Sequence, residues 1–431
     1  MTVVLYVGGV LLFVVGFLAS IALHEFGHLI PAKRFGVAVP RFSVGFGKTL
    51  VSKRVGGTEY ALKALPLGGY VKLVGMLPPA PADRPDTRDT WIARLVADAR
   101  EAEWDEVRES RSGRPFYTLK TWQKVVTMAG GPITNVVLAF GIFACIFGFY
   151  GTFEPSNTTT IGVVSKCVIP GNVKRDECTD TDPVAPAAAA GIKPGDRIVA
   201  FNGTPVATWE ELSPLIRANR SRTADIVVER GQQTLTLSAT TMVSLRPAPA
   251  NPKTYEEVGF LGVSPVRERV QHGLGYTARA MGDMVVLTSK SLLQFPVKLY
   301  HVARSALGLE QRDPEGPISI VGAGRVAGQI ASHATGTIGA KAITIMSLIA
   351  SLNLFLGVFN LVPLLPLDGG QIAGALYEAI KRRLARLLGR PDPGHADIAR
   401  MLPVAYVVAM GFILMTLLLV YVDLVNPISI S

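Results

Sequence analysis

The chain has 431 residues, of which 49% are hydrophobic and 18% are charged, and its formal net charge is +10. Its hydrophobic residues come in long blocks, which is typical of a polytopic membrane protein and argues against a chain of two or three soluble domains. The basic residues are spread over loops without interleaved aromatic residues, so we expect no nucleic-acid partner.

Four blocks are long enough to cross a lipid bilayer. The first lies within residues 1–30; because no basic n-region precedes it and no small-residue cleavage site follows it, we interpret it as a retained helix and not as a signal peptide. The other three lie within residues 125–150, 343–372 and 403–425. The sequence therefore predicts an α-helical membrane protein with about four transmembrane helices.

The first block ends in the motif H-E-F-G-H, residues His24 to His28. Histidines four residues apart lie on one face of a helix, close enough to bind one zinc ion. Glu25 lies beside that face, where it would serve as a general base toward a water molecule. Because an H-x-x-x-H pair also occurs by chance in helices, the motif alone carries a false-positive risk. Its position at the end of a membrane helix predicts a zinc site built into the membrane.

The charges of the loops predict the orientation. The loop 31–124 carries 17 Lys and Arg against 10 Asp and Glu, and the basic helix and loop at 373–402 also carry an excess of cations. Both loops should be cytoplasmic under the positive-inside rule. Both chain termini and the long segment between the second and third spans are then extracytoplasmic, and the zinc site lies near the cytoplasmic side. The cations of the second loop are Lys381, Arg382, Arg383, Arg386, Arg390 and Arg400.

A third zinc ligand is offered by Asp368, which follows a stretch broken by Pro363 and Pro366. The simpler interpretation is a helix start, since Asp368 stands where an N-cap residue would. Its depth favours a ligand, because an acid at a broken membrane helix is costly without a partner or a cavity, and the histidine pair lies at that level.

Taken together, these motifs resemble the site-2 protease family of intramembrane zinc metalloproteases, in particular bacterial members with one extracytoplasmic PDZ domain. The resemblance includes H-E-x-x-H and the stretch N-x-x-P-x-x-x-L-D-G-G that begins at Asn360. It also includes Phe42 to Lys48, which resembles the family's G-x-G element, Gly57 to Gly75, which resembles its membrane-dipping β-hairpin, and Trp122 to Asn135, which resembles the start of its second core helix. Pro366 lies one place later than in some relatives.

The resemblance implies that Zn(2+) is bound by His24, His28 and Asp368 and that Glu25 is the catalytic base. Asn360, on the same broken segment, would orient the substrate or stabilise the oxyanion. Because a helical substrate must unwind before its carbonyls can be attacked, glycines and the hairpin are expected to hold it. These predicted substrate-binding residues are Gly45, Gly47, Leu67, Gly68, Gly69 and Tyr70.

Two further features belong to the loop 31–124. By pattern alone, residues 57–76 are an ordinary cytoplasmic hairpin, but their apolar content directly after a membrane helix favours a membrane-associated β-hairpin whose edge strand pairs with an extended substrate. Residues 87–114 are charged and favour a solvated helix with a narrow apolar stripe.

The segment after the second span resembles an inserted α/β PDZ domain at residues 160–243, present in one copy. Cys167 and Cys178 lie in it, and we expect them to form a disulfide in an oxidising compartment. An amphipathic segment at 258–342 should lie along the outer leaflet.

By resemblance, the protein is expected in a bacterial plasma membrane as a multi-pass protease. Its substrates would be single-span membrane proteins already shortened by another protease, such as anti-sigma factors, with remnant signal peptides as a second possibility. The alternative is a membrane scaffold or transporter with a structural zinc site and a PDZ domain that recruits partners. A structural site would normally have a fourth protein ligand, and the sequence offers no further Cys or His at that depth.

Overall fold

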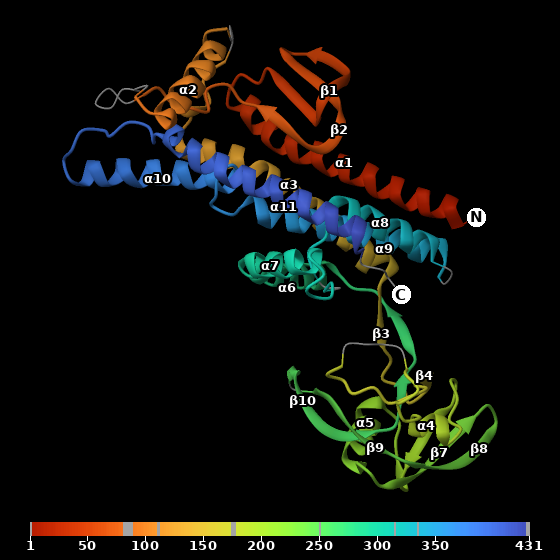
Figure 1. Ribbon diagram of the computed structural model, residues 1–431. Coiled ribbons are helices and arrows are strands. Elements are labelled where there is room, and N and C mark those ends of the chain that lie inside the picture. Colours follow the sequence, from red (N-terminus) through yellow and green to blue (C-terminus); the bar gives the residue numbers. More distant parts are fainter. Residues whose placement is uncertain are drawn as a thin grey trace. The chain divides into compact units, whose positions relative to one another are not determined.

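The computed structural model describes residues 2–80, 89–109, 113–173, 178–249, 251–313, 316–333 and 336–427. The chain forms two compact units, which we describe separately (Figure 1). The helical unit comprises Met1–Ile146 and Gly273–Ser431, and the strand-rich unit comprises Phe147–His272.

Among the described residues, four helices are long and apolar enough to span a membrane, which confirms the predicted number. Each extends a few residues beyond the block expected from the sequence or is shifted against it. They are α1 (Thr2–Arg34), α3 (Thr121–Cys145, continued by the π-helical turn η2, Ile146–Tyr150), α9 (Ile338–Asn360) and α11 (Leu402–Val425, preceded by the 3-10 turn η3, Ile398–Met401). The third span ends at Asn360, and the L-D-G-G motif of the range 343–372 follows it.

Small residues let α3 pack closely against its neighbours. Gly27 of α1 and Gly130 of α3 touch backbone to backbone, so that a Cβ on either would overlap the carbonyl of the other. Gly357 of α9 also packs against α3, where a Cβ would come within 3.0 Å of the Pro132 carbonyl oxygen. Close approach of this kind is how membrane helices gain packing energy without a hydrophobic driving force. Consequently α3 lies between α1 and α9.

The segment expected at 258–342 divides differently. Its first part, up to His272, belongs to the strand-rich unit. Two amphipathic helices follow, α6 (Leu274–Leu293) and α7 (Phe295–Ala306). A third helix, α8 (Ile320–Ser332), packs into the helical core, where fully buried Phe13 of α1 contacts its alanines. Within the expected range 258–342, the amphipathic part is thus α6 and α7, whereas the alanines and glycines at 322–331 suit helix packing instead of a surface.

The β-hairpin begins earlier than expected. Strand β1 (Arg41–Val55) pairs with β2 (Thr58–Lys72) around the turn Gly56-Gly57. Arg41 faces Glu59 on one side and Lys72 on the other, so the start of β1 lies between two parts of β2. At residues 65–69, β2 crosses from one edge of β1 to the other. The hairpin at 57–76 thus accounts for only the second of the two strands.

Helix α2 (Trp91–Glu109) lies in the predicted charged insert and fastens two loops. Glu103 accepts hydrogen bonds from the backbone N–H groups of Gly75 (2.6 Å) and Met76 (2.8 Å), just after the hairpin. Arg100, almost fully buried, forms an ion pair with Asp397 at 2.8 Å, just before α11. The insert is therefore part of the fold and not only a solvated helix.

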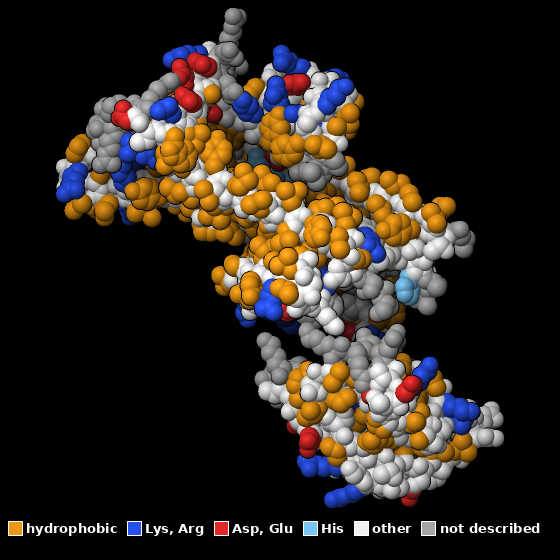
Figure 2. Space-filling view, in the orientation of Figure 1, with side chains coloured by type: hydrophobic (Ala, Val, Ile, Leu, Met, Phe, Trp, Pro, Cys, Tyr) orange, Lys and Arg blue, Asp and Glu red, His pale blue; other side chains and the backbone are white. Residues whose placement is uncertain are grey.

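Helix α10 (Asp368–Leu387) follows α9 and runs beneath α3. It is fixed there by a buried ion pair between Glu378 and Lys124 of α3, with 3.0 Å between Oε2 and Nζ. Figure 2 shows hydrophobic side chains covering the long helices and Lys and Arg gathered over the hairpin and the far end of α10.

The strand-rich unit is built on a four-stranded antiparallel sheet in the order β6-β5-β7-β8. Its core includes Ile161, Ile198, Leu212, Ile226 and Leu261, all almost fully buried. Strand β11 pairs with β4, so the unit continues past the boundary expected at residue 243. The elements are β3 (Thr152–Pro155), β4 (Ile161–Val164), α4 (Pro186–Ala189), β5 (Arg197–Phe201), β6 (Thr204–Pro205), α5 (Trp209–Asn219), β7 (Thr223–Arg230), β8 (Gln233–Thr240), β9 (Met242–Ala248), β10 (Asn251–Phe260), β11 (Val263–Pro265) and β12 (Arg267–Val270).

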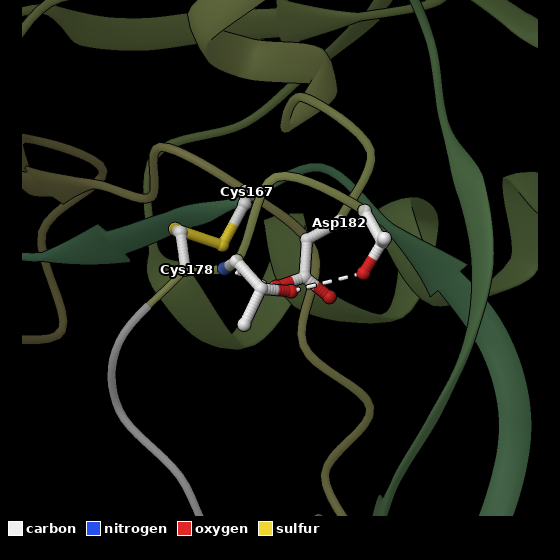
Figure 3. The surroundings of a disulfide bond; sticks show 5 residues. Cys167, Cys178 and Asp182 are labelled. Carbon is white, nitrogen blue, oxygen red and sulfur yellow. Dashed lines mark hydrogen bonds between the residues drawn. A yellow bond between two sulfur atoms is a disulfide. The ribbon is translucent and has the colours of Figure 1, made fainter.

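Two links stabilise loops of this unit. Cys167 and Cys178 form a disulfide, and Asp182 beside it accepts hydrogen bonds from the N–H and hydroxyl of Thr179 (Figure 3). Elsewhere in the unit, buried Asp196 binds Arg230 of β7, and this guanidinium holds the pKa of the Asp196 carboxyl below its usual value despite the burial.

Candidate metal centre

Three potential metal ligands meet where α1 approaches the start of α10. The Nε2 atoms of His24 and His28 lie 3.2 Å apart, and each lies 3.4 Å from Oδ2 of Asp368. These ligand atoms all fall within 4.8 Å of one another, close enough to bind one metal ion. Residues separated by more than 300 positions are thus brought together at one point.

The turn between α9 and α10 delivers Asp368 to this point. The chain leaves α9 at Asn360, passes the cis peptide bond Leu365-Pro366 and enters α10 at Asp368. Gly369 lies so close to the carbonyls of residues 361 and 362 that a Cβ would overlap them. Asp368 does not occupy the N-cap position that the simpler interpretation gave it: Leu367 is the N-cap, and Asp368 is the first helical residue, with its carboxylate beside the histidines.

Helix α3 contacts both histidines of the site. The Nδ1 atom of His28 lies 2.8 Å from the backbone carbonyl oxygen of Thr127, which can only accept, so Nδ1–H donates and Nε2 keeps its lone pair. Gly131 lies against both rings, where a Cβ would overlap Nε2 of His28 and come within 2.7 Å of Nε2 of His24. Two imidazole nitrogens and one carboxylate are a protein ligand set of catalytic zinc sites. The residues present fit zinc.

Glu25 is buried next to this group, with 9% of its surface exposed. Strand β2 covers it: a Cβ on Gly69 would lie 3.0 Å from Cγ of Glu25 and 2.9 Å from Ile21. Gly69, one of the residues expected to hold substrate, therefore lies against Glu25 of the H-E-F-G-H motif.

The other expected substrate-binding residues lie along the hairpin. Gly45 and Gly47 of β1 and Gly68 of β2 have positive φ angles of 89°, 81° and 128°, which favour glycine. The Tyr70 hydroxyl accepts a hydrogen bond from Lys63 at 3.0 Å. Burial raises the pKa of Tyr70, but hydrogen bonds from Lys63 and other side chains lower this pKa to about 8. Leu67 also lies on β2, with its side chain outside the described part of the structure.

Two asparagines complete the surroundings. Asn360 is half-buried at the last position of α9, before the turn that leads to Asp368. Asn135 of α3 has 1% of its surface exposed, and its Nδ2 atom lies 3.1 Å from Nδ1 of His24. The sequence analysis missed this contact, although a buried amide inside an apolar span is itself an indication of function.

Comparison with known proteins identifies the class. The sequence profile of peptidase family M50, the site-2 proteases, matches residues 12–389, and the chain belongs to this family. It is 34% identical to the zinc metalloprotease Rip1 of Mycobacterium tuberculosis over 99% of both chains and 33% identical to Rip1 of Mycolicibacterium smegmatis over 98% of both. It is 30% identical to the metalloprotease MmpA of Caulobacter vibrioides over 87% of both.

The protein is thus a zinc-dependent metalloendopeptidase with several membrane spans, of a family that acts on membrane proteins within the bilayer. The prediction of the family, the enzyme class and the cofactor is confirmed, and a pure scaffold or transporter is not supported.

Proposed function

We propose that this metalloprotease cuts the transmembrane segment of single-span membrane proteins after an earlier protease has removed most of their outer domain. The meeting of His24, His28 and Asp368 at the ends of membrane helices carries this proposal. Ionisable side chains at such a depth are costly unless they have a function, and a peptide bond cut there must itself lie in or near the bilayer.

In this proposal His24, His28 and Asp368 bind the zinc ion. When bound, zinc supplies Lewis-acid activation of water and of the scissile carbonyl. The Glu25 carboxylate takes up the proton that the attacking water gives away and then delivers it to the leaving amine nitrogen. The side-chain amide of Asn360 orients the substrate and donates to its carbonyl oxygen as negative charge develops there.

We further propose that β2 holds the substrate as an added strand. A transmembrane helix buries its carbonyls in hydrogen bonds, so the segment to be cut must become extended, and a strand edge stabilises an extended chain by main-chain pairing. Gly69 supports this, because the lack of a side chain lets the backbone of the strand lie close to Glu25, where an added Cβ would come within 3.0 Å of Cγ. The residues assigned to this role are Gly45, Gly47, Leu67, Gly68, Gly69 and Tyr70.

The strand-rich unit is proposed to be a PDZ domain that filters substrates by size. The order of β4, α4, β5, α5, β7 and β8 is the order expected for a bacterial PDZ domain at 160–243, and β11 extends it. An extracytoplasmic domain of this kind would hinder substrates with large outer parts, which favours membrane proteins shortened by a first cut. Anti-sigma factors and remnant signal peptides are the proposed substrates.

We place the protein in a bacterial plasma membrane with both termini and the strand-rich unit outside the cytoplasm. The cations over the hairpin and α10 support a cytoplasmic location for these elements (Figure 2). The bond between Cys167 and Cys178 supports an oxidising compartment for the strand-rich unit. The zinc site then lies near the cytoplasmic side.

The proposal is tested by Glu25→Gln in proteoliposomes that contain a single-span substrate. We expect cleavage to fall by about 10²- to 10⁴-fold, the usual contribution of a general base, while bound zinc stays at the wild-type level. Asp368→Ala should lose both zinc and cleavage. Undiminished cleavage by Glu25→Gln would contradict the mechanism, and exchange of an exposed acid, Glu257→Gln, is the control.

A further inference from the structure

A zinc ligand must keep a lone pair on the coordinating nitrogen, and this requirement decides the state of His24. Its Nε2 atom faces Asp368 and His28, at 3.4 and 3.2 Å. In a neutral imidazole that binds metal through Nε2, the single proton lies on Nδ1, and Nδ1–H then needs an acceptor.

The group that Nδ1 of His24 faces is the side-chain amide of Asn135. Asn135 is 1% exposed, and its Nδ2 atom lies 3.1 Å from Nδ1 of His24. An amide NH₂ only donates, so this orientation would place the imidazole proton on Nε2, where it blocks the metal. Only the oxygen of the amide can accept from Nδ1–H.

The amide oxygen is free to take that role. Within the described residues, Oδ1 of Asn135 is buried and has no hydrogen-bond partner. A half-turn of the amide plane exchanges oxygen and nitrogen without changing its shape. The exchanged orientation therefore gives up no hydrogen bond of the oxygen and gains the bond from Nδ1–H of His24.

From this we infer that Asn135 is a positioning residue: its Oδ1 accepts from Nδ1–H of His24 and so fixes the tautomer and ring orientation in which Nε2 binds zinc. The inference rests on the zinc ligands assigned in the proposed function.

The neighbouring ligand uses the same helix for the same purpose. His28 donates from Nδ1 to the Thr127 carbonyl at 2.8 Å, so α3 holds one histidine by its backbone and the other by a side chain. The two helices run antiparallel, since His28 meets Thr127 and His24 meets Asn135. The contact of Gly27 with Gly130 between these pairs fixes the spacing. Partners of this kind fix ligand geometry and strengthen metal binding.

Two exchanges at one position test the inference in the full-length protein. Asn135→Leu keeps the volume and removes the acceptor, whereas Asn135→Asp keeps an acceptor and cannot donate in its ionised form. We expect zinc affinity, measured by competition with a chelator, to fall about 10- to 100-fold in Asn135→Leu and to stay near the wild-type value in Asn135→Asp. A matched control is Asn353→Leu, which removes another fully buried intramembrane asparagine, one that contacts Ser20 and not a histidine.

Zinc affinity of Asn135→Leu equal to that of the wild type would overturn the inference. Equal losses in Asn135→Leu and Asn135→Asp would also overturn it, because donation by the amide nitrogen would then be what matters. As a second measurement, ring-¹⁵N spectra of histidine-labelled wild-type protein with zinc should show His24 protonated at Nδ1, and protonation at Nε2 would sink the idea. The variant His24→Ala distinguishes failure of the inference about Asn135 from failure of the ligand assignment. If this variant binds zinc as tightly as the wild type, the ligand assignment itself fails.

Discussion

Gly131 of α3 lies directly against the Nε2 atom of His28, in space that the Cβ of any other residue would fill. The position is occupied by glycine although glycine in a helix interior costs about 1 kcal/mol relative to alanine. Glycine thus lets α3 approach the two imidazoles closely, at the expense of helix stability.

Gly131→Ala should therefore leave α3 helical and damage the zinc site. A Cβ at residue 131 must displace both imidazoles, and a displacement of about 1 Å costs on the order of 10²-fold in rate. We expect bound zinc and cleavage to fall together, as measured by metal analysis and a cleavage assay. Gly141→Ala on the same helix is the control, because nothing lies within 4 Å of its added Cβ; a site that tolerates alanine at 131 would contradict this account.

Gly69→Ala separates substrate binding from metal binding. The added Cβ would lie 2.9 Å from Ile21 and from the Ser43 carbonyl oxygen, and 3.0 Å from Cγ of Glu25. It should push β2 away from Glu25 without touching the histidines, so we expect about 10- to 100-fold slower cleavage with full zinc content. Loss of zinc in this variant would show that the hairpin supports the metal site and not the substrate. Gly8→Ala in α1, which meets open space, is the control.

Removal of zinc distinguishes a catalytic from a structural metal. Helices α1 and α3 are joined by the contact of Gly27 with Gly130, and α10 is fixed to α3 by the ion pair of Glu378 with Lys124, neither of which involves the metal ligands. A chelator should therefore abolish cleavage and leave the helix content by circular dichroism unchanged, and added zinc should restore cleavage. Unfolding on chelation would instead indicate a structural site.

The sequence predicted the spans and the meeting of the three proposed zinc ligands because these signals are local or strongly constrained by the bilayer. A helix places His24 and His28 on one face. Their link to Asp368 could be predicted only because the three residues lie at the same depth in the membrane. The contact of Asn135 with His24 could not be predicted in this way, since it depends on how closely two helices pack around Gly27 and Gly130. Pairing of the start of β1 with both parts of β2 was missed for a similar reason: strand register depends on neighbours that periodicity does not reveal.

In the strand-rich unit, Asp196 should make stability depend on pH. Its folded-state pKa is lowered by Arg230, so the stabilisation is present above the unfolded pKa of about 3.9 and is lost as the pH falls through the lowered folded-state value. Asp196→Asn should destabilise the unit by about 1 to 3 kcal/mol at neutral pH and weaken its acid sensitivity. Hydrogen exchange of β5 and β7 in the full-length protein measures this.

Asp225→Asn on β7 is the control, because exchange of an exposed side chain usually changes stability by less than about 0.5 kcal/mol. Equal protection of Asp196→Asn and the wild type at neutral pH would show that the ion pair contributes nothing.

The disulfide provides a test of both compartment and stability. If the strand-rich unit lies outside the cytoplasm, alkylation of the unreduced protein from membranes should modify Cys145 alone, since Cys167 and Cys178 are bonded. Modification of all three cysteines would contradict the bond and remove one support for the orientation. The double exchange of Cys167 and Cys178 to Ser should destabilise the unit by at most about 3 kcal/mol, because the bond closes a short loop and mainly restricts the unfolded chain. The proposed zinc ligands lie on α1 and α10, so bound zinc should stay at the wild-type level, and its loss would tie the metal site to the folding of the strand-rich unit.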